Sequence, residues 1–213
     1  MKLLLVNINR SRTELDGCQA IARTIRKLGS KRRVSVDIVH YPDADARNKR
    51  TRYAGLIIGP NGDPFPSYPK EFDDFLTWLR RRRKPTLGIC GGHQALALAH
   101  GAPVGPVANV PAARDSYAGM PKQTGLTRIR WMGDPDPLLD GVSGECEVVV
   151  SHVDEVKDLP YGFRLLAIGD PCHVQAIRAD RRPMWGVQFH PEKPCEDPSG
   201  HRILANFIGL CRP

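Results

Sequence analysis

Apolar residues occur with two kinds of spacing along the first hundred residues. Short unbroken apolar runs predict buried strands, whereas apolar residues three and four positions apart predict helices with one buried face. Tyr41–Arg52 is polar and predicts a surface loop or a short helix. The other predicted segments are strands at Lys2–Asn9, Val34–His40, Ala54–Gly59 and Thr86–Ile89, and helices at Leu15–Leu28, Pro69–Arg83 and Gly92–His100. Strands that alternate with helices in this way predict an α/β fold whose mainly parallel, twisted sheet has helices on both faces.

The second half of the chain contains more strands and fewer helices. Gly101–Pro121 is rich in glycine and proline and predicts a loop region. A final helix is predicted at His201–Leu210. The strands predicted between these two segments are Leu126–Trp131, Glu147–Ser151, Leu165–Ile168, Val174–Ile177 and Met184–Phe189. We therefore expect a smaller strand-rich part within a single domain over residues 1–213, because a chain of 213 residues can bury one substantial core.

The composition is that of a globular protein in water. Hydrophobic residues make up 41% and charged residues 25% of the chain, which are ordinary values. No apolar run approaches the length of a membrane span and no signal peptide is visible, so we expect a cytoplasmic protein without a membrane partner. The cysteines form no CxxC pair and no metal-type spacing with histidine, which predicts no metal site and fits a reducing compartment. They are Cys18, Cys90, Cys146, Cys172, Cys195 and Cys211.

The net charge of +8 raises the question of nucleic-acid binding. Two basic clusters, Lys31–Arg33 and Arg80–Lys84, each follow a predicted helix and precede a predicted strand. Cations at that position complement the negative end of the helix dipole, and no aromatic residues are interleaved with them. Solvated helix ends are favoured roughly fourfold over a nucleic-acid site, because charge runs are unspecific. A docking surface for an acidic partner protein is an intermediate alternative.

A candidate nucleophile lies between the predicted strand that ends at Ile89 and the helix that follows it. Residues Gly88–Gln94 read GICGGHQ, and a Gly-x-Cys-x-Gly pattern between strand and helix is typical of a nucleophile elbow with cysteine in place of serine. Gly88 and Gly92 leave room for the sharp turn that lifts the thiol of Cys90 out of the sheet. A helix N-terminus also favours the thiolate form of a cysteine.

A candidate base lies at the end of another predicted strand, in the segment GVQFHPE of residues 186–192. The strand places His190 at its carboxyl end, and Pro191 ends the strand because it has no N–H to donate. Glu192 can bond one ring nitrogen of His190, which leaves the other nitrogen to take a proton from Cys90. The pattern therefore predicts a catalytic triad of Cys90, His190 and Glu192.

In these two motifs and their order, the chain resembles the class I glutamine amidotransferases. The resemblance extends from Met1 to the final predicted helix. It implies a flavodoxin-like fold, hydrolysis of the side-chain amide of glutamine, and no metal or organic cofactor. The segments DPDPLLDG and SHVDEV are most similar to the amidotransferase part of GMP synthetases. Relatives of the anthranilate-synthase and carbamoyl-phosphate-synthetase types, and a specialised biosynthetic pathway, are alternatives.

The resemblance also implies an oxyanion hole made of two backbone N–H groups. One belongs to Gly91, directly after the nucleophile, and the other to Gly59, in the loop after the third predicted strand. That loop reads GPNGDP where the family often has GPGDP, so it carries one apparent extra residue. The roles of Asn61 and Gly62 are therefore left open.

For substrate binding, the resemblance implies that Gln94 holds the amino-acid end of glutamine. The backbone of Ser151, His152 and Val153 is expected to hold the same group. His152 competes with His190 as the base, but it lacks the His-Pro-Glu context, so His190 is preferred. His93 is interpreted as a structural histidine.

The expected reaction is attack of the Cys90 thiolate on glutamine, release of ammonia and hydrolysis of a γ-glutamyl thioester. Members of the family usually pass the ammonia to a synthetase. Only a final helix follows Glu192, so we expect a separate synthetase partner and a glutaminase that is weak until docked. A stand-alone γ-glutamyl hydrolase that acts on γ-glutamyl peptides or amides is one alternative, and a non-catalytic regulator is another. The three hypotheses are weighted roughly seven, two and one in ten, because a motif is a hypothesis until geometry supports it.

Overall fold

Eleven strands and five α-helices lie within residues 1–133, 135–142 and 144–211, which the computed structural model describes. The strands are β1 (Lys2–Asn7), β2 (Ser35–His40), β3 (Gly55–Ile58), β4 (Thr86–Ile89), β5 (Val104–Pro106), β6 (Gln123–Trp131), β7 (Glu145–His152), β8 (Asp154–Val156), β9 (Phe163–Gly169), β10 (Ala176–Ala179) and β11 (Met184–Val187). The helices are α1 (Asp16–Leu28), α2 (Ala44–Arg50), α3 (Glu71–Arg80), α4 (Gly91–Ala99) and α5 (Ser199–Leu210).

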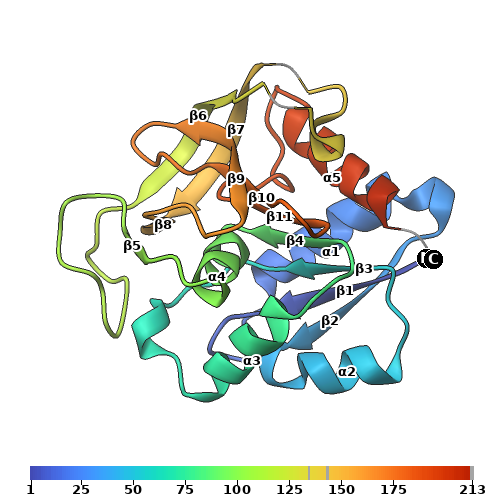
Figure 1. Cartoon of the computed structure of the whole chain (residues 1–213), viewed down its shortest axis with the longest axis horizontal. Helices are drawn as coiled ribbons and strands as arrows, with labels where there is room; N and C mark the ends of the chain where they lie inside the picture. Colours follow the sequence, from blue (N-terminus) through green and yellow to red (C-terminus); the bar gives the residue numbers. More distant parts are fainter. Residues whose placement is uncertain (134, 143, 212–213) are drawn as a thin grey trace.

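The main sheet has a parallel half and an antiparallel half (Figure 1). Its strand order is β2-β1-β3-β4-β11-β10-β9-β6-β7, and β5 pairs with β8 in a separate small sheet. The strands β2, β1, β3, β4 and β11 run parallel to one another. From β11 onward, the pairs β11–β10, β10–β9, β9–β6 and β6–β7 are antiparallel. In the parallel half, β11 lies beside β4 with Val187 opposite Ile89. This pairing brings the two sequence motifs to the same end of the sheet.

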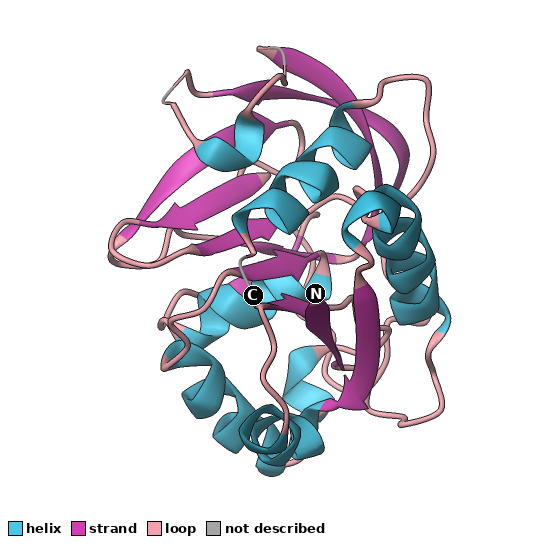
Figure 2. Ribbon diagram, turned by 90° about the vertical axis from the view of Figure 1, so that its right-hand side faces the viewer, coloured by secondary structure: helices cyan, strands magenta, loops and turns pink. Residues whose placement is uncertain are grey.

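Helices cover both faces of the parallel half (Figures 1 and 2). Successive side chains of a strand point to opposite faces, and β1 follows this rule. Leu3 and Leu5 belong to the buried cluster that contains α1 and α5, whereas Leu4 and Val6 belong to the cluster that contains α3 and α4. All four side chains are fully buried. Burial on both faces explains why this strand reads as an unbroken apolar run.

The outer edge of β7 is covered by the chain that follows β11. The His190 N–H donates to the Val149 carbonyl oxygen at 2.8 Å, and the Glu147 N–H donates to Asp197 Oδ2 at 2.9 Å. Cys195 Sγ also lies 3.6 Å from the Glu147 carbonyl oxygen. The segment that carries the GVQFHPE motif therefore continues along the edge of the antiparallel half.

The architecture confirms the predicted α/β fold with a smaller strand-rich part, and several boundaries differ. The helix predicted over Pro69–Arg83 is shorter at both ends. At its start the Phe72 N–H donates to the Pro69 carbonyl oxygen, and at its end the Arg81 and Arg82 N–H groups donate to the carbonyl oxygens three residues earlier, so both ends are tighter turns that are not α-helical. The polar segment Tyr41–Arg52 contains α2, and β6 begins at Gln123, three residues earlier than predicted. The predicted strand at Val174–Ile177 lies at Ala176–Ala179 instead. None of the helices in the described residues is long and apolar enough to cross a bilayer.

Candidate active site

The nucleophile elbow forms where β4 meets α4. Cys90 has φ 53° and ψ −108°, a positive-φ conformation that costs energy for a residue with a side chain. The glycines around it permit a very close approach: a Cβ at Gly92 would overlap the Ile58 carbonyl oxygen, and a Cβ at Gly88 would overlap the Gly92 carbonyl oxygen. The Cys90 N–H is held by the Val187 carbonyl oxygen at 2.8 Å. The surrounding backbone thus fixes the strained turn predicted from the motif.

The His190 and Glu192 side chains meet beside this turn. His190 Nδ1 lies 2.8 Å from Glu192 Oε1, and both residues are buried. Burial alone would lower the pKa of His190, but the charge of Cys90 and a hydrogen bond with it, followed by Glu192, raise the pKa to about 10. The ring is therefore protonated at neutral pH, with Nδ1 bound by Glu192 and Nε2 left for the sulfur. The structure thus brings together the three residues of the predicted triad.

The loop after β3 corrects the prediction for Gly59. The Gly59 N–H donates to the Val6 carbonyl oxygen at 2.9 Å, as part of the pairing between β3 and β1, so it is not available to an oxyanion. The Gly62 N–H is likewise bound, by Asn9 Oδ1 at 2.8 Å. Between them, Asn61 lies against Gly91: a Cβ at Gly91 would lie 2.8 Å from the Asn61 backbone nitrogen. The longer loop therefore presents Asn61 to the elbow.

A cavity of about 200 Å³ opens beside the sulfur of Cys90. The predicted substrate-binding residues Gln94, Ser151, His152 and Val153 all line it, as does Asn61. The other lining residues are Gly62, Tyr117, Met120, Lys122 and Asp154. The cavity thus joins the elbow of the parallel half to the end of β7 in the antiparallel half.

His152 is poorly suited to be the base. Its Nδ1 lies 2.9 Å from the Asp154 carbonyl oxygen. Burial, together with the positive charges of His190 and Lys122, lowers the pKa of His152 to about 4. Its ring is therefore neutral at neutral pH and fixed by the backbone. His93 is fully buried, and burial, with a contribution from His152, lowers its pKa to about 3.

Four polar residues of the site were not predicted from the sequence: Gln188, Asp154, Tyr117 and Lys122. Gln188 is fully buried, with Nε2 3.8 Å from Cys90 Sγ and Oε1 accepting from Gln94 Nε2 at 3.1 Å. Asp154 and Tyr117 line the cavity and are joined by a hydrogen bond. A signal existed for Gln188, a polar residue inside the otherwise apolar GVQF strand end, and for Asp154, in the SHVDEV segment. Tyr117 lies in an irregular loop with no periodicity to mark it. Among the described residues, no group of three His, Cys, Asp or Glu side chains is placed to hold a metal ion.

Comparison with known proteins gives a consistent result. The family model "Glutamine amidotransferase class-I" matches residues 15–210. A glutamine-hydrolysing GMP synthase subunit of Archaeoglobus fulgidus is 33% identical over 195 residues, which cover 90% of this chain and 91% of that protein. The protein of the same name from Methanothermobacter thermautotrophicus is 37% identical over 158 residues, or 74% of this chain and 75% of the relative. A crystal structure from Thermoplasma acidophilum, described as a candidate GMP synthase subunit, is 27% identical with a TM-score of 0.78, and the match covers 99% of this chain and 94% of that one.

Proposed function

Because this chain belongs to the class I glutamine amidotransferase family, we propose that it hydrolyses the side-chain amide of glutamine with Cys90, His190 and Glu192 as its catalytic triad. The observation that carries the proposal is the contact of His190 with both the elbow cysteine and Glu192. A protonated imidazole beside a cysteine at a helix N-terminus suits attack by sulfur on a carboxamide.

The proposed reaction has two halves. The Cys90 sulfur attacks the Cδ carbon of glutamine, and the amide oxygen becomes an oxyanion held by the N–H groups of Gly91 and Asn61. As the C–N bond breaks, His190 gives its Nε2 proton to the leaving nitrogen, and ammonia departs. Water then loses a proton to His190 and attacks the thioester, which releases glutamate and restores Cys90. Glu192 holds the ring of His190 throughout.

The cavity beside the sulfur supports glutamine as the substrate. Asp154 is buried, and its Oδ1 has no hydrogen-bond partner among the described residues. A carboxylate in that state is matched by the α-ammonium group of an amino acid. Lys122 on the same cavity offers a charge to the α-carboxylate, and Gln94 and the Ser151–Val153 backbone complete the predicted contacts.

We further propose that a separate synthetase subunit receives the ammonia and that the product is GMP. The support is that relatives matching about 90% of this chain are each named as one subunit of a glutamine-hydrolysing GMP synthase, a name that implies a further subunit. The chain would then be a weak glutaminase alone and a stronger one in the complex.

The test is ammonia release from glutamine by the purified chain, with Cys90→Ala, and with Cys211→Ala as the matched control, since Cys211 lies against Gly55 at the start of β3 and does not line the cavity. Cys90→Ala should abolish release and Cys211→Ala should leave it intact. Adding the synthetase subunit from the same organism should raise release and allow glutamine-dependent GMP formation. Cleavage of γ-glutamyl amides that depends on Cys90, without release from glutamine, would contradict the proposal and favour a stand-alone γ-glutamyl hydrolase.

A further inference from the structure

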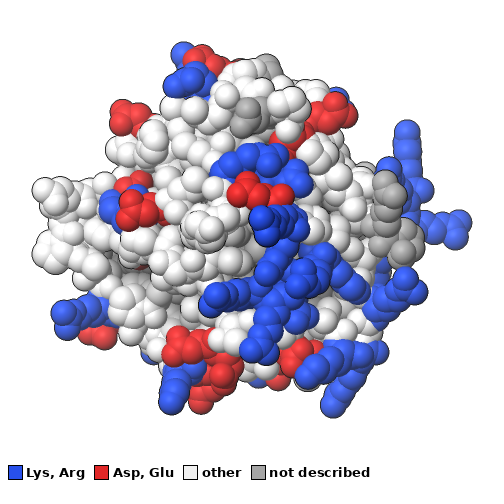
Figure 3. Space-filling model, in the orientation of Figure 1, with Lys and Arg blue, Asp and Glu red and all other residues white. Residues whose placement is uncertain are grey.

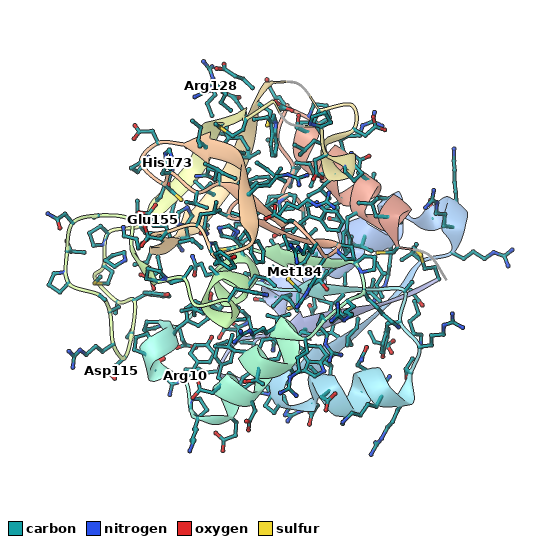
Figure 4. The ribbon with its side chains drawn as sticks, in the orientation of Figure 1. Arg10, Asp115, Arg128, Glu155, His173 and Met184 are labelled. Atoms are coloured by element: carbon teal, nitrogen blue, oxygen red, sulfur yellow. The ribbon has the colours of Figure 1, made fainter. Side chains whose placement is uncertain are left out.

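The loop between β5 and β6 lies beside the glutamine cavity. It is the long connection that projects at the left of Figure 1, and Figure 4 labels Asp115 near its lower end. Tyr117 and Met120 of this loop, and Lys122 just after it, line the cavity that contains Cys90. The same loop also borders a second groove of about 310 Å³, through Ala112 and Ala113.

Tyr117 is the side chain that ties this loop to the rest of the site. Its neighbours Ser116 and Ala118 are exposed, whereas Tyr117 turns inward. Its hydroxyl donates to Asp154 Oδ2 at 2.7 Å. Among the hydrogen bonds of the described residues, the others that involve residues 108–121 stay within the loop. Burial and the Asp154 carboxylate both raise the pKa of Tyr117, so the hydroxyl keeps the proton that it donates.

A series of hydrogen bonds and close contacts connects Asp154 to the nucleophile. Its carbonyl oxygen accepts from Gln94 Nε2 at 2.5 Å. The same nitrogen donates to Gln188 Oε1 at 3.1 Å, and Gln188 Nε2 lies 3.8 Å from Cys90 Sγ. The Asp154 carbonyl oxygen also lies within hydrogen-bond distance of His152 Nδ1. The residue that binds the loop therefore also orients the cavity's polar side chains.

From this geometry we propose that Tyr117 is a positioning residue that closes the glutamine cavity and aims the Asp154 carboxylate at the substrate. The loop acts as a cover that is fastened at one point. With the hydroxyl in place, one carboxylate oxygen is bound and the other faces the cavity for the α-ammonium group. Without the hydroxyl, the carboxylate can rotate and the cover can lift. This role deepens the proposed glutaminase function and rests on it.

The first arm of the test is the steady-state kinetics of Tyr117→Phe, which keeps the ring and removes only the hydroxyl. Loss of a hydrogen bond to a charged group predicts a KM for glutamine about tenfold higher. The turnover number kcat should change less than about threefold, because the triad is untouched. Tyr161→Phe is the matched control, since Tyr161 is 98% exposed and does not line the glutamine cavity. An unchanged KM, or a loss confined to kcat, would overturn the proposal.

The second arm measures access to Cys90 without any turnover. Tyr117→Phe should be alkylated by iodoacetamide at Cys90 several-fold faster than the native chain and Tyr161→Phe, with unchanged circular dichroism. The alkylation rate reports whether the loop shields Cys90, and it does so whether or not glutamine is the substrate. Failure of the proposed function and failure of this inference are therefore distinguishable. Equal alkylation rates would overturn the inference.

A double-mutant cycle with Asp154→Asn tests the same contact. The increase in KM of the double variant should be smaller than the product of the increases in the two single variants, because both changes remove the same hydrogen bond.

Discussion

At the scale of single residues, the backbone of the site positions the nucleophile, and the side chains set its protonation. The backbone forces Cys90 into a strained turn, through glycines that no larger residue can replace without overlap. The proposed chemistry depends on His190, whose raised pKa comes from Cys90 and Glu192 acting against burial. Cys90 alone already favours the protonated form of His190, and Glu192 adds to this effect. We therefore expect that losing Glu192 costs less activity than losing His190.

This inequality predicts an order of effects within the triad. His190→Ala removes the proton donor and should lower kcat for glutamine about 10²- to 10⁴-fold. Glu192→Gln keeps an oxygen that can accept from Nδ1 and should cost less. Steady-state ammonia release from the two variants measures the order. A larger loss for Glu192→Gln would mean that the roles have been assigned wrongly.

The oxyanion donor can be tested at Asn61. Asn61→Pro removes the backbone N–H that we assign to the oxyanion hole and should lower kcat about 10²- to 10³-fold. Asn61→Ala retains the N–H and controls for loss of the side chain, whose Nδ2 donates to the Asp63 carbonyl oxygen. Equal activities of the proline and alanine variants, with native circular dichroism, would exclude Asn61 as the donor.

At the scale of elements, the sequence predicts what periodicity and motifs can encode. The strands of the parallel half and their helices follow from apolar runs and helical spacing. The three residues of the proposed triad follow from two motifs at strand ends. The short strands β5 and β8 were missed, because three residues are too few to show a period. Gly59 was misassigned because its N–H belongs to a pairing with β1 that only the fold reveals. Tyr117 could not be predicted, since its role arises from a tertiary contact of an irregular loop.

The basic cluster Arg80–Lys84 lies at the C-terminal end of α3, and two of its residues make specific contacts there. Figure 3 shows Lys and Arg side chains gathered in the middle of one face, where Figure 1 places α3 and the β10–β11 connection. Arg82 lies with its guanidinium carbon 4.4 Å from the centre of the Trp78 ring, and its Nε donates to the Trp78 carbonyl oxygen at 3.0 Å. An Arg182 guanidinium nitrogen contacts the Arg80 carbonyl oxygen. These contacts support the interpretation of the cluster as a helix end.

Arg82→Ala should therefore lower the free energy of unfolding by about 1 kcal/mol, because it removes both a cation–π contact and a bond to a helix-terminal carbonyl. Arg83→Ala is the matched control within the same cluster, and should change the value by less than about 0.5 kcal/mol. Urea unfolding of the two variants measures the difference. Similar effects of the two substitutions would argue against a specific structural role for Arg82.

At the scale of the whole molecule, two buried histidines with lowered pKa values make stability fall at acid pH, whereas His190, whose pKa is raised, acts in the opposite direction. The pKa values of His93 and His152 are lowered to about 3 and about 4, against about 6.5 in an unfolded chain. Between the lowered pKa of each histidine and pH 6.5, the unfolded chain binds a proton at that histidine and the folded chain does not. Their contribution is therefore fully present above pH 6.5 and is lost as pH falls, by about 2 kcal/mol for each histidine at pH 5.

Urea unfolding at pH 8 and pH 5 tests this dependence. His93→Gln should reduce the fall in unfolding free energy between the two values, whatever its effect at pH 8. His173→Gln, at an exposed position labelled in Figure 4, should leave the fall unchanged. The same fall in the native chain and in His93→Gln would refute the assignment to His93.

The segment that covers the edge of β7 has a consequence for solubility. A bare strand edge offers unpaired N–H and C=O groups to other chains, and proteins protect such edges to avoid aggregation. Here the protection comes from residues 190–197, through the His190 N–H and the Asp197 carboxylate. The segment that contains the proposed base is thus also a shield against self-association. Substitutions that loosen this segment should cost soluble yield as well as turnover, so selection for solubility alone would tend to preserve the geometry of the base.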